Sequence, residues 1–326
     1  MSRRDFLTLL GGAATLPLAA QAQQLGMPVV GFVSPGSADA LTDRAAAFRK
    51  GLSEAGYVEG QNVTVEYHWL EGRYDRQPAL MDDLVRRRVA VIAAWGDPTA
   101  LAAKAATGTI PIVFGVGQDP VKFGLVASLA RPGGNATGIN FFNQEVVTKQ
   151  LGLLHELVPK AVRVAVLVNP ANATVAESTL RDAQKAGPAV GLQIHALNAS
   201  TSHEIDEAFA SLAPARPDAL VVAGDSFFTS RRTQLVTLTA RDRLPAAYVT
   251  REIVAAGGLM SYGTNVAASL HQIGIYTGSI LKGVKPADLP VLQSTKIELV
   301  INVQTAKLLG IDVPPTLLAT ADEVIE

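Results

Sequence analysis

The chain repeats one order of elements twice, and this repeat constrains the fold more than any other feature of the sequence. Residues 29–33 and 164–168 are short apolar runs without polar alternation. A helical spacing of apolar residues follows each run and ends at Gly56 in the first copy and at Gly187 in the second. Because strands covered on both faces show such runs, the pattern predicts helices alternating with the strands of a parallel sheet.

The repeat continues through two further strands in each copy. A Gly-Asp pair follows a predicted strand at Gly96 and again at Gly224, and a strand containing Pro comes next in both copies. About twelve strands would strain one long doubly wound sheet, which is the alternative. We therefore predict two Rossmann-like α/β lobes with parallel sheets and a ligand cleft between them. The expected boundaries assign residues 27–139 and 263–292 to lobe 1, and residues 140–262 and 293–326 to lobe 2.

The first 22 residues are expected to be an export signal and not part of the fold. Arg3 and Arg4 precede an uncharged stretch that is shorter than the about 20 residues of a membrane-spanning helix. Ala20 and Ala22 then match a small-residue cleavage site. The start resembles the bacterial twin-arginine signal, which implies cleavage after Ala22 and a periplasmic mature chain. An amphipathic N-terminal helix or a retained anchor is the alternative.

Composition and motif searches exclude several classes of function. The 28 Lys and Arg residues balance 29 Asp and Glu residues, so no basic excess predicts nucleic-acid binding. The chain has 0 Cys, which excludes disulfides, thiolate catalysis and Cys-ligated zinc. The 5 His residues show no metal-binding spacing, and neither a phosphate-binding loop nor a complete dinucleotide fingerprint is present. We expect no metal and no cofactor.

One motif raises the possibility of an enzyme. Gly224, Asp225 and Ser226 resemble the nucleophile motif of some esterases. A serine nucleophile needs a histidine base within reach. That family places its serine near the start of the chain, whereas Ser226 lies mid-chain, and Ala267 stands where the Asp paired with His271 would be. We therefore expect no enzyme activity, and a serine hydrolase is a remote alternative.

Candidate ligand-binding residues lie in the loops that follow the predicted strands, because open α/β sheets bind ligands at the carboxyl ends of their strands. A helix is predicted to begin near Thr99, and its free N–H groups would attract an anion. Asp97 and Asp225 would either contact the ligand or cap the helices that follow them. The polar and small candidates are Ser34, Pro35, Gly96, Asp97, Thr99, Gln118, Asp119, Asn169 and Asp225. The aromatic candidates are Phe142, Phe227 and Tyr262, with one member of each Phe pair (141/142 and 227/228) expected to reach the ligand.

Five motifs in order resemble one protein family over essentially the whole mature chain. They are Gly51-Leu52-x-Glu54-x-Gly56-Tyr57-x-Glu59-Gly60-x-Asn62, the strand at residues 110–114, Asp119-Pro120-Val121, Arg131-Pro132-Gly133-Gly134-Asn135-x-Thr137-Gly138, and Ile301-Asn302-x-x-Thr305-Ala306-x-x-Leu309-Gly310. The chain thereby resembles the ABC-transporter substrate-binding proteins of the tryptophan/tyrosine-binding branch.

This resemblance implies a type I periplasmic binding protein with three crossovers, expected near residues 138–140, 262–265 and 292–296. It implies a hinge that closes over a small ligand, often an amino acid. The turn at residues 96–99 would meet the ligand carboxylate, and Asp225 its amino group. Amino-acid binders often have a Thr-Pro-Ala turn at this place, whereas this chain has Asp97-Pro98-Thr99. A carboxylate at Asp97 would repel the carboxylate of an amino-acid ligand. Amides, aromatic acids and other solutes therefore remain open.

The expected function is that of a periplasmic solute receptor for an ABC importer, binding a small polar or aromatic solute such as an amino acid or a related carboxylate or amide. Its partners would be the solute, a membrane permease and the ATPase of that permease, and we expect the receptor itself to be a monomer. The alternative is a sensory module that passes its ligand state to a receptor.

Overall fold

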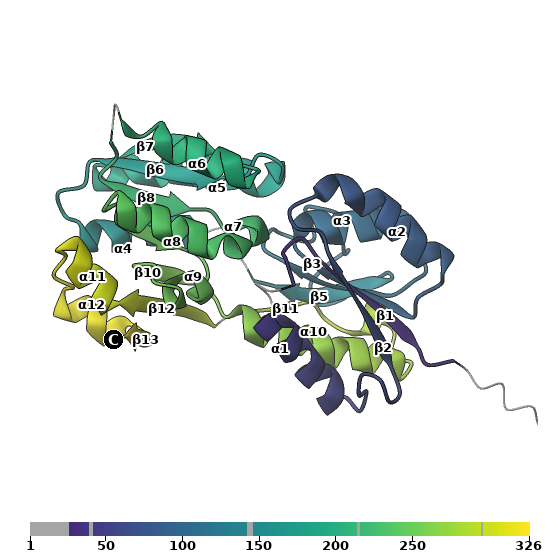
Figure 1. Ribbon diagram of the computed structural model, residues 1–326. Coiled ribbons are helices and arrows are strands. Elements are labelled where there is room, and N and C mark those ends of the chain that lie inside the picture. The colour runs from purple at the N-terminus through teal and green to yellow at the C-terminus, as the bar shows by residue number, and fades with distance from the viewer. Residues whose placement is uncertain (1–25, 39–41, 142–145, 214–215, 295) are drawn as a thin grey trace, which may run out of the picture.

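The computed structural model describes residues 26–38, 42–141, 146–213, 216–294 and 296–326, which form two α/β lobes side by side (Figure 1). The expected export signal at residues 1–22 lies outside the described residues. Across the described residues, none of the helices combines the length and the apolar character that a membrane crossing requires.

Lobe 1 is built from the first copy of the repeat. Its elements are β1 (Val29–Ser34), α1 (Thr42–Glu54), β2 (Thr64–Trp69), the 3-10 helix η2 (Tyr74–Arg76), α2 (Gln77–Arg86), β3 (Val91–Trp95), α3 (Asp97–Ala106), β4 (Ile112–Val116) and β5 (Ala136–Asn140). In the described chain they form a sheet of order β11-β5-β4-β3-β1-β2, in which all pairs are parallel.

Lobe 2 contains the second copy. Its elements are α4 (Val146–Leu157), β6 (Arg163–Val168), α5 (Ala173–Ala186), η4 (Gly187–Val190), β7 (Gln193–Asn198), α6 (Ser202–Ala210), β8 (Ala219–Val222), α7 (Ser226–Ser230), α8 (Arg232–Arg241), β9 (Ala246–Tyr248), α9 (Arg251–Ala255) and β10 (Met260–Thr264). The chain then returns to lobe 1 as α10 (Val266–Leu281), η6 (Pro286–Asp288) and β11 (Leu292–Gln293). It ends in lobe 2 as β12 (Ile297–Asn302), α11 (Val303–Leu309), α12 (Pro315–Thr320) and β13 (Glu323–Ile325).

Among the described elements the chain changes lobe three times, after β5, after β10 and after β11, so the predicted fold class is confirmed. At each crossover the chain leaves its sheet one or two residues later than the expected lobe boundary. Asn140 and Gln293 pair within the sheet of lobe 1, and Thr264 pairs within that of lobe 2. The reason is that each strand runs on into the hinge before the chain crosses.

The sheet of lobe 2 differs from the predicted all-parallel arrangement in one strand pair. Its order is β13-β12-β10-β9-β8-β6-β7, and β10 and β12 are antiparallel, with Thr264 opposite Ile297. Both residues lie at the hinge, where β10 leaves the lobe and β12 enters it. A strand that enters at the end where its neighbour leaves has to run in the opposite direction.

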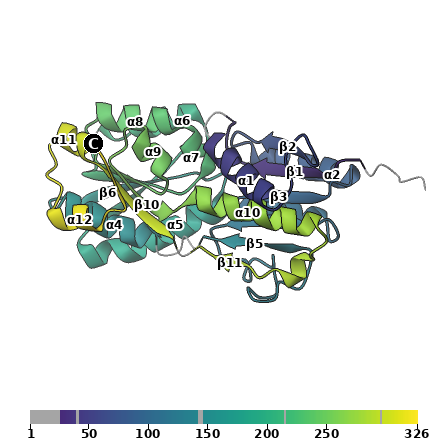
Figure 2. The same ribbon diagram turned by 90° about the horizontal axis from the view of Figure 1, so that it is seen from below.

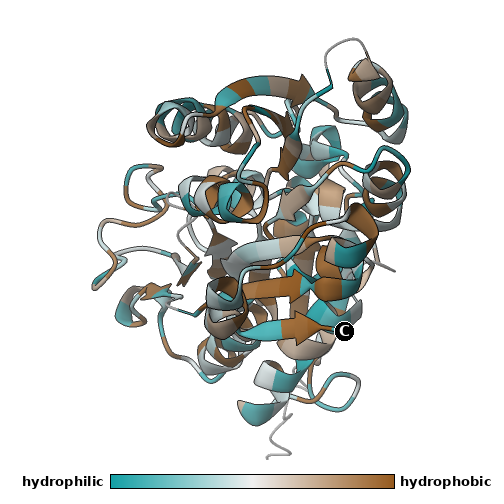
Figure 3. Ribbon diagram, turned by 90° about the vertical axis from the view of Figure 1, so that its left-hand side faces the viewer, coloured by the Kyte–Doolittle hydropathy of each residue, from teal (hydrophilic) through white to brown (hydrophobic). Residues whose placement is uncertain are grey.

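Apolar side chains cover both faces of each sheet, as the uninterrupted strand patterns predict. In lobe 2 one cluster contains Val164 and Val166, and the cluster on the other face contains Ala165 and Leu167. Figure 3 shows the strands of this lobe largely in apolar colours. In lobe 1, α1 and α10 lie side by side over the sheet in both ribbon views (Figures 1 and 2). These rigid cores hold the strand ends that line the cleft.

Candidate ligand-binding site

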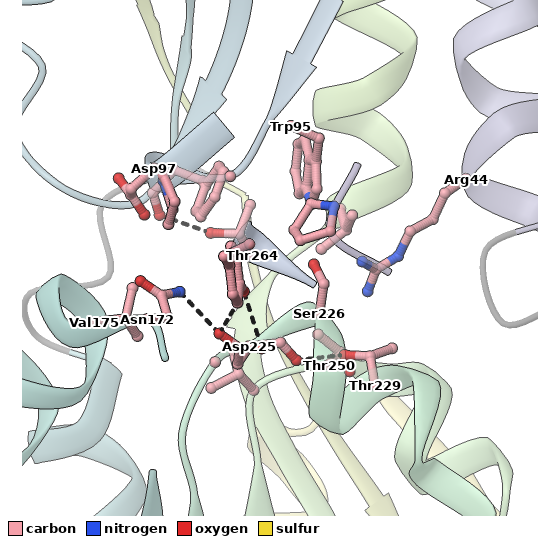
Figure 4. A pocket seen from close by; sticks show the side chains of 18 residues that line it. Arg44, Trp95, Asp97, Asn172, Val175, Asp225, Ser226, Thr229, Thr250 and Thr264 are labelled. Carbon is pink, nitrogen blue, oxygen red and sulfur yellow. Dashed lines mark hydrogen bonds between the residues drawn. The ribbon is translucent and has the colours of Figure 1, made fainter. Parts of the chain in front are cut away.

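A cavity of about 60 Å³ lies between the lobes, where the carboxyl ends of strands from both sheets face each other (Figure 4). Lobe 1 contributes Pro35, Arg44, Tyr74, Trp95, Gly96, Asp97, Pro98, Phe141 and, from α10, Val266. Lobe 2 contributes Asn172, Val175, Gly224, Asp225, Ser226, Thr229, Val249, Thr250 and Thr264. The cavity therefore lies at the carboxyl ends of the strands, where open α/β sheets bind their ligands.

Asp225 is the centre of a network of hydrogen bonds that spans the cleft. Its carboxylate caps α7 by accepting a hydrogen bond from Phe227 N at 2.8 Å, and it accepts further bonds from Asn172 Nδ2 at 2.8 Å and Asn169 Nδ2 at 3.3 Å. The hydroxyl of Tyr74, from lobe 1, donates to it at 3.1 Å. Burial and the charge of Asp225 raise the pKa of Tyr74 well above its usual range, so this hydroxyl stays a donor.

Asp97 occupies the start of α3 but does not cap that helix. The capping position belongs to Gly96, whose φ of 96° favours glycine and which makes no side-chain bond. The Asp97 Oδ1 atom instead accepts hydrogen bonds from Gly117 N at 3.1 Å and Gln118 N at 2.9 Å. Burial and, to a smaller extent, the charge of Asp225 raise the pKa of Asp97 to about 6. Two buried carboxylates from facing lobes thus line the same cavity.

Two buried polar atoms at the cavity lack a hydrogen-bond partner among the described residues. One is Nη2 of Arg44, whose Nε donates to Glu252 Oε1 of lobe 2 at 2.9 Å. The other is Oδ1 of Asn172, whose amide nitrogen already contacts Asp225. Buried polar atoms are normally paired, so an unpaired donor and an unpaired acceptor at one cavity indicate a ligand that carries both kinds of group.

The apolar part of the cavity is aromatic on the side of lobe 1. The rings of Trp95 and Phe141 stack at a centroid distance of 5.0 Å and an interplanar angle of 24°. Pro35, Pro98, Val175, Val249 and Val266 complete the apolar lining. Stacked aromatic surfaces of this kind favour a flat apolar group, at about 0.5–1.5 kcal/mol per ring pair beyond burial.

The structure brings together six of the residues predicted for the site. Pro35, Gly96, Asp97 and Asp225 line the cavity, and Asn169 contacts Asp225. Gln118 contacts Asp97 through its backbone N, and its Nε2 donates to Oγ of Ser178 in lobe 2 at 2.9 Å. The rule that ligands bind at strand ends accounts for all six.

Three other predicted residues have local structural roles and do not line the cavity. The Ser34 hydroxyl accepts a 3.4 Å bond from Gly36 N in its own turn. The Thr99 hydroxyl is fully buried and accepts a hydrogen bond from Gln77 Nε2 at 3.0 Å. The Asp119 carboxylate accepts bonds from the backbone of its own loop. A strand-end position brings a residue near the cleft, but the helix or turn that follows decides where its side chain points.

The aromatic predictions require correction. Phe227 does not line the cavity, because its ring packs on Phe228 at 5.4 Å within the core of lobe 2. Tyr262 packs against the other core of that lobe. Phe142 lies outside the described residues, and its neighbour Phe141 lines the cavity.

Sequence reasoning missed the other polar residues of the cavity lining, which are Arg44, Tyr74, Asn172, Ser226, Thr229, Thr250 and Thr264. Arg44 had a detectable signal, since it is a charged residue on the apolar face of its helix, four residues before the buried Phe48. Asn172 precedes α5 and follows the end of β6 by four residues. Tyr74 belongs to η2, which no apolar periodicity marks.

Comparisons with known proteins agree with this geometry. The family model for the ABC transporter substrate binding protein matches residues 29–325. The chain is 28% identical to a tyrosine-binding protein of Clostridioides difficile (strain R20291) over 264 residues, which are 80% of this chain and 75% of that protein. Solved structures of other solute-binding proteins, at 12–13% identity, share the fold alone.

Two solved structures at 25% identity or above are similar to this chain over most of its length. The chain is similar to an ABC domain from Streptococcus pneumonia in complex with L-Trp, at 27% identity and a TM-score of 0.77, covering 92% of this chain and 100% of that one. It is similar to the ligand-free, open structure of a substrate-binding protein with adhesive properties from Clostridium difficile, at 25% identity and a TM-score of 0.63, covering 91% and 99%. The chain belongs to the family of ABC transporter substrate binding proteins.

Proposed function

We propose that this chain closes over a small solute carrying a protonated amino group and presents it to an ABC importer. The observation that carries the proposal is the pair of buried carboxylates, Asp97 and Asp225, on facing lobes. Closing the lobes on an empty cleft brings two negative charges together. A cation between them relieves that repulsion, so the solute stabilises the closed form by binding it better than the open one.

The amino group is assigned to Asp225 and Asn172. An ammonium has three N–H donors and no acceptor. The carboxylate of Asp225 and the unpaired Oδ1 of Asn172 are neighbouring acceptors joined through the Asn172 amide nitrogen. Trp95 and Phe141 support a flat apolar group in the same cavity. Since similar proteins are described as a tyrosine-binding protein and as an L-Trp complex, aromatic amino acids are the first candidates.

The cellular setting forms part of the proposal. The paired Arg3 and Arg4 and the Ala20 to Ala22 site support twin-arginine export, cleavage after Ala22 and a periplasmic location. The closed monomer would dock on a membrane permease, and the ATPase of that permease would supply the energy. The resemblance to importer receptors supports these partners.

The test measures binding by the mature chain, from residue 23. A thermal-shift screen of the twenty amino acids, aromatic carboxylates, amides, amines and small sugars comes first. Solute at about 1,000 times its Kd stabilises the fold by about 4 kcal/mol, which is a shift of roughly 8 °C or more. We expect compounds with a protonated amine to give the shifts. Shifts from sugars or carboxylates alone would overturn the proposal.

Asp225→Asn should then weaken binding of the best amine at least 30-fold, because truncating a buried charge contact costs about 2–5 kcal/mol. Asp218→Asn is the matched control. Asp218 also accepts two backbone hydrogen bonds, from Val162 and Arg163, but it does not line the cavity. An affinity within about twofold of the wild type for Asp225→Asn would remove Asp225 from the site.

A further inference from the structure

Arg44 is in an unfavourable place for a cation. The residue is only 3% exposed. It lies in the first turn of α1, where the helix dipole favours negative charge. A buried guanidinium needs partners for its five N–H donors. The position therefore calls for more anionic partners than an ordinary surface arginine.

The protein supplies one anionic partner, and that partner belongs to the other lobe. Arg44 Nε donates to Glu252 Oε1 in α9 at 2.9 Å. Burial raises the pKa of Glu252, but the charge of Arg44, its hydrogen bond to the carboxylate and smaller contributions together outweigh burial and leave this pKa below its usual value, so the pair is ionised. Among the described residues nothing accepts a hydrogen bond from Nη2 of Arg44. The buried guanidinium of Arg44 therefore keeps one N–H donor group, Nη2, without a hydrogen-bond acceptor among the described residues.

The unpaired donor lies at the cavity, opposite the acceptors. Arg44 is one of the residues that line it. Figure 4 shows its guanidinium on one side of the pocket, and Asp225 with Asn172 on the other. The cavity therefore has a donor pole at Arg44 and an acceptor pole at Asp225 and Asn172. A solute that satisfies both poles carries an acceptor group as well as an ammonium.

We propose that Arg44 binds the carboxylate of the solute and that the protein therefore selects zwitterionic amino acids over simple amines. This inference rests on the proposed function, which places the ammonium at Asp225. It moves the carboxylate from the turn at residues 96–99 to α1. The turn is unsuitable because Asp97 already presents a carboxylate there, and the Oδ1 atom of Asp97 also accepts the hydrogen bonds of the neighbouring donors Gly117 N and Gln118 N in the loop after β4. Arginine and carboxylate form the stronger, charge-assisted class of hydrogen bond.

The competing explanation is that Arg44 only holds the lobes together through Glu252. Such a latch would support every ligand alike, because closure is common to all of them. A carboxylate contact would support only ligands that have a carboxylate. Comparing an amino acid with its own carboxamide, which keeps the amine and the side chain, separates the two explanations.

The experiment measures Kd by calorimetry at pH 7.5 for L-tryptophan and L-tryptophanamide, L-tyrosine and L-tyrosinamide, and any other amino acid that binds in the screen with its amide. 4-Aminobutanoate tests a wider spacing of the two charges. The variants are Arg44→Met, which removes the guanidinium and keeps an unbranched side chain that ends near the position of Nε, and Glu252→Gln, which removes the negative charge of the latch and keeps Arg44.

We expect the wild type to bind the acid at least 30-fold more tightly than the amide. Arg44→Met should abolish this preference by weakening the acid at least 30-fold more than the amide. Glu252→Gln should keep the preference. A wild type that binds acid and amide equally overturns the inference even if Arg44→Met does not fold. Equal losses for acid and amide in both variants also overturn it, and both results leave the proposed function standing. A wild type that binds no amino compound overturns the proposed function and this inference together.

Discussion

Asp97 has two roles, because its carboxylate connects two loops of the site and also contributes a negative charge to the cavity when it is ionised. Its Oδ1 joins the start of α3 to the loop after β4 through Gly117 and Gln118. The carboxylate is buried at the cavity, and its pKa is raised to about 6. Because a raised pKa means that the folded state prefers the protonated acid, ionisation of Asp97 destabilises the fold near neutral pH.

The pH dependence of Asp97→Asn follows from this shift. The pKa rises from 3.8 to about 6, which is worth about 3 kcal/mol. This contribution is fully present below pH 3.8 and is lost as the pH rises through 6. Asn can accept both backbone bonds through its own Oδ1 and carries no charge. Relative to the wild type, the variant should therefore gain unfolding free energy between pH 4 and 7, measured by urea titration at each pH. A constant difference across that range would contradict the raised pKa.

The contact between α1 and α10 depends on two glycines that face each other. A Cβ atom at Gly51 would lie 1.9 Å from the carbonyl oxygen of His271, and one at Gly274 would lie 2.2 Å from that of Phe48. These helices come from opposite ends of the chain, and α10 enters from the hinge. The close approach fixes the middle of α10 against α1 and the rest of lobe 1.

Gly51→Ala should therefore destabilise the protein, although alanine is the better helix former. Overpacking of this kind costs about 1–3 kcal/mol or more, and the helices can relieve it only by moving apart. We expect a melting temperature lower by roughly 3–10 °C. Gly152→Ala in α4 is the control, because nothing lies within 4 Å of its Cβ position. That variant should be neutral or gain up to about 1 kcal/mol, and a neutral Gly51→Ala would contradict the described packing.

Several hydrogen bonds join the two lobes across the cleft. Arg44 pairs with Glu252, Gln118 with Ser178, and Tyr74 with Asp225. Ser37 N also donates to the Ser230 hydroxyl at 3.0 Å. Each of these contacts joins residues that separate when the cleft opens, so each shifts the equilibrium toward the closed form without affecting the lobes themselves.

Tyr74→Phe tests this division between closure and stability. It removes the hydroxyl that reaches Asp225 across the cleft, and we expect an affinity about 10-fold lower, which is about 1.4 kcal/mol, with little change in the melting temperature of the free protein. Tyr276→Phe makes the same change within lobe 1, where the hydroxyl donates to Pro290 O at 2.9 Å. That control should leave affinity unchanged. Equal losses of affinity in the two variants would show that Tyr74 has no special role in closure.

Much of the fold could be predicted because its signals are local. The uninterrupted strands and the helix stop at Gly56 each depend on a few neighbouring residues, and Gly56 indeed follows the end of α1 with a φ of 89°. The strand-end rule likewise placed Asp97 and Asp225 at the cleft, because the direction of a parallel strand follows from the alternation of strands and helices.

The remainder of the site depends on how the two lobes meet. Tyr74 and Asp225 are 151 positions apart, and Arg44 and Glu252 are 208 apart. Local patterns carry no information about which of Phe141 and Phe227 faces the cavity, or about Asp97 turning to the backbone of another loop. Those outcomes were decided by tertiary packing, since burial of charge and pairing across the cleft are properties of the closed pair of lobes and of neither lobe alone.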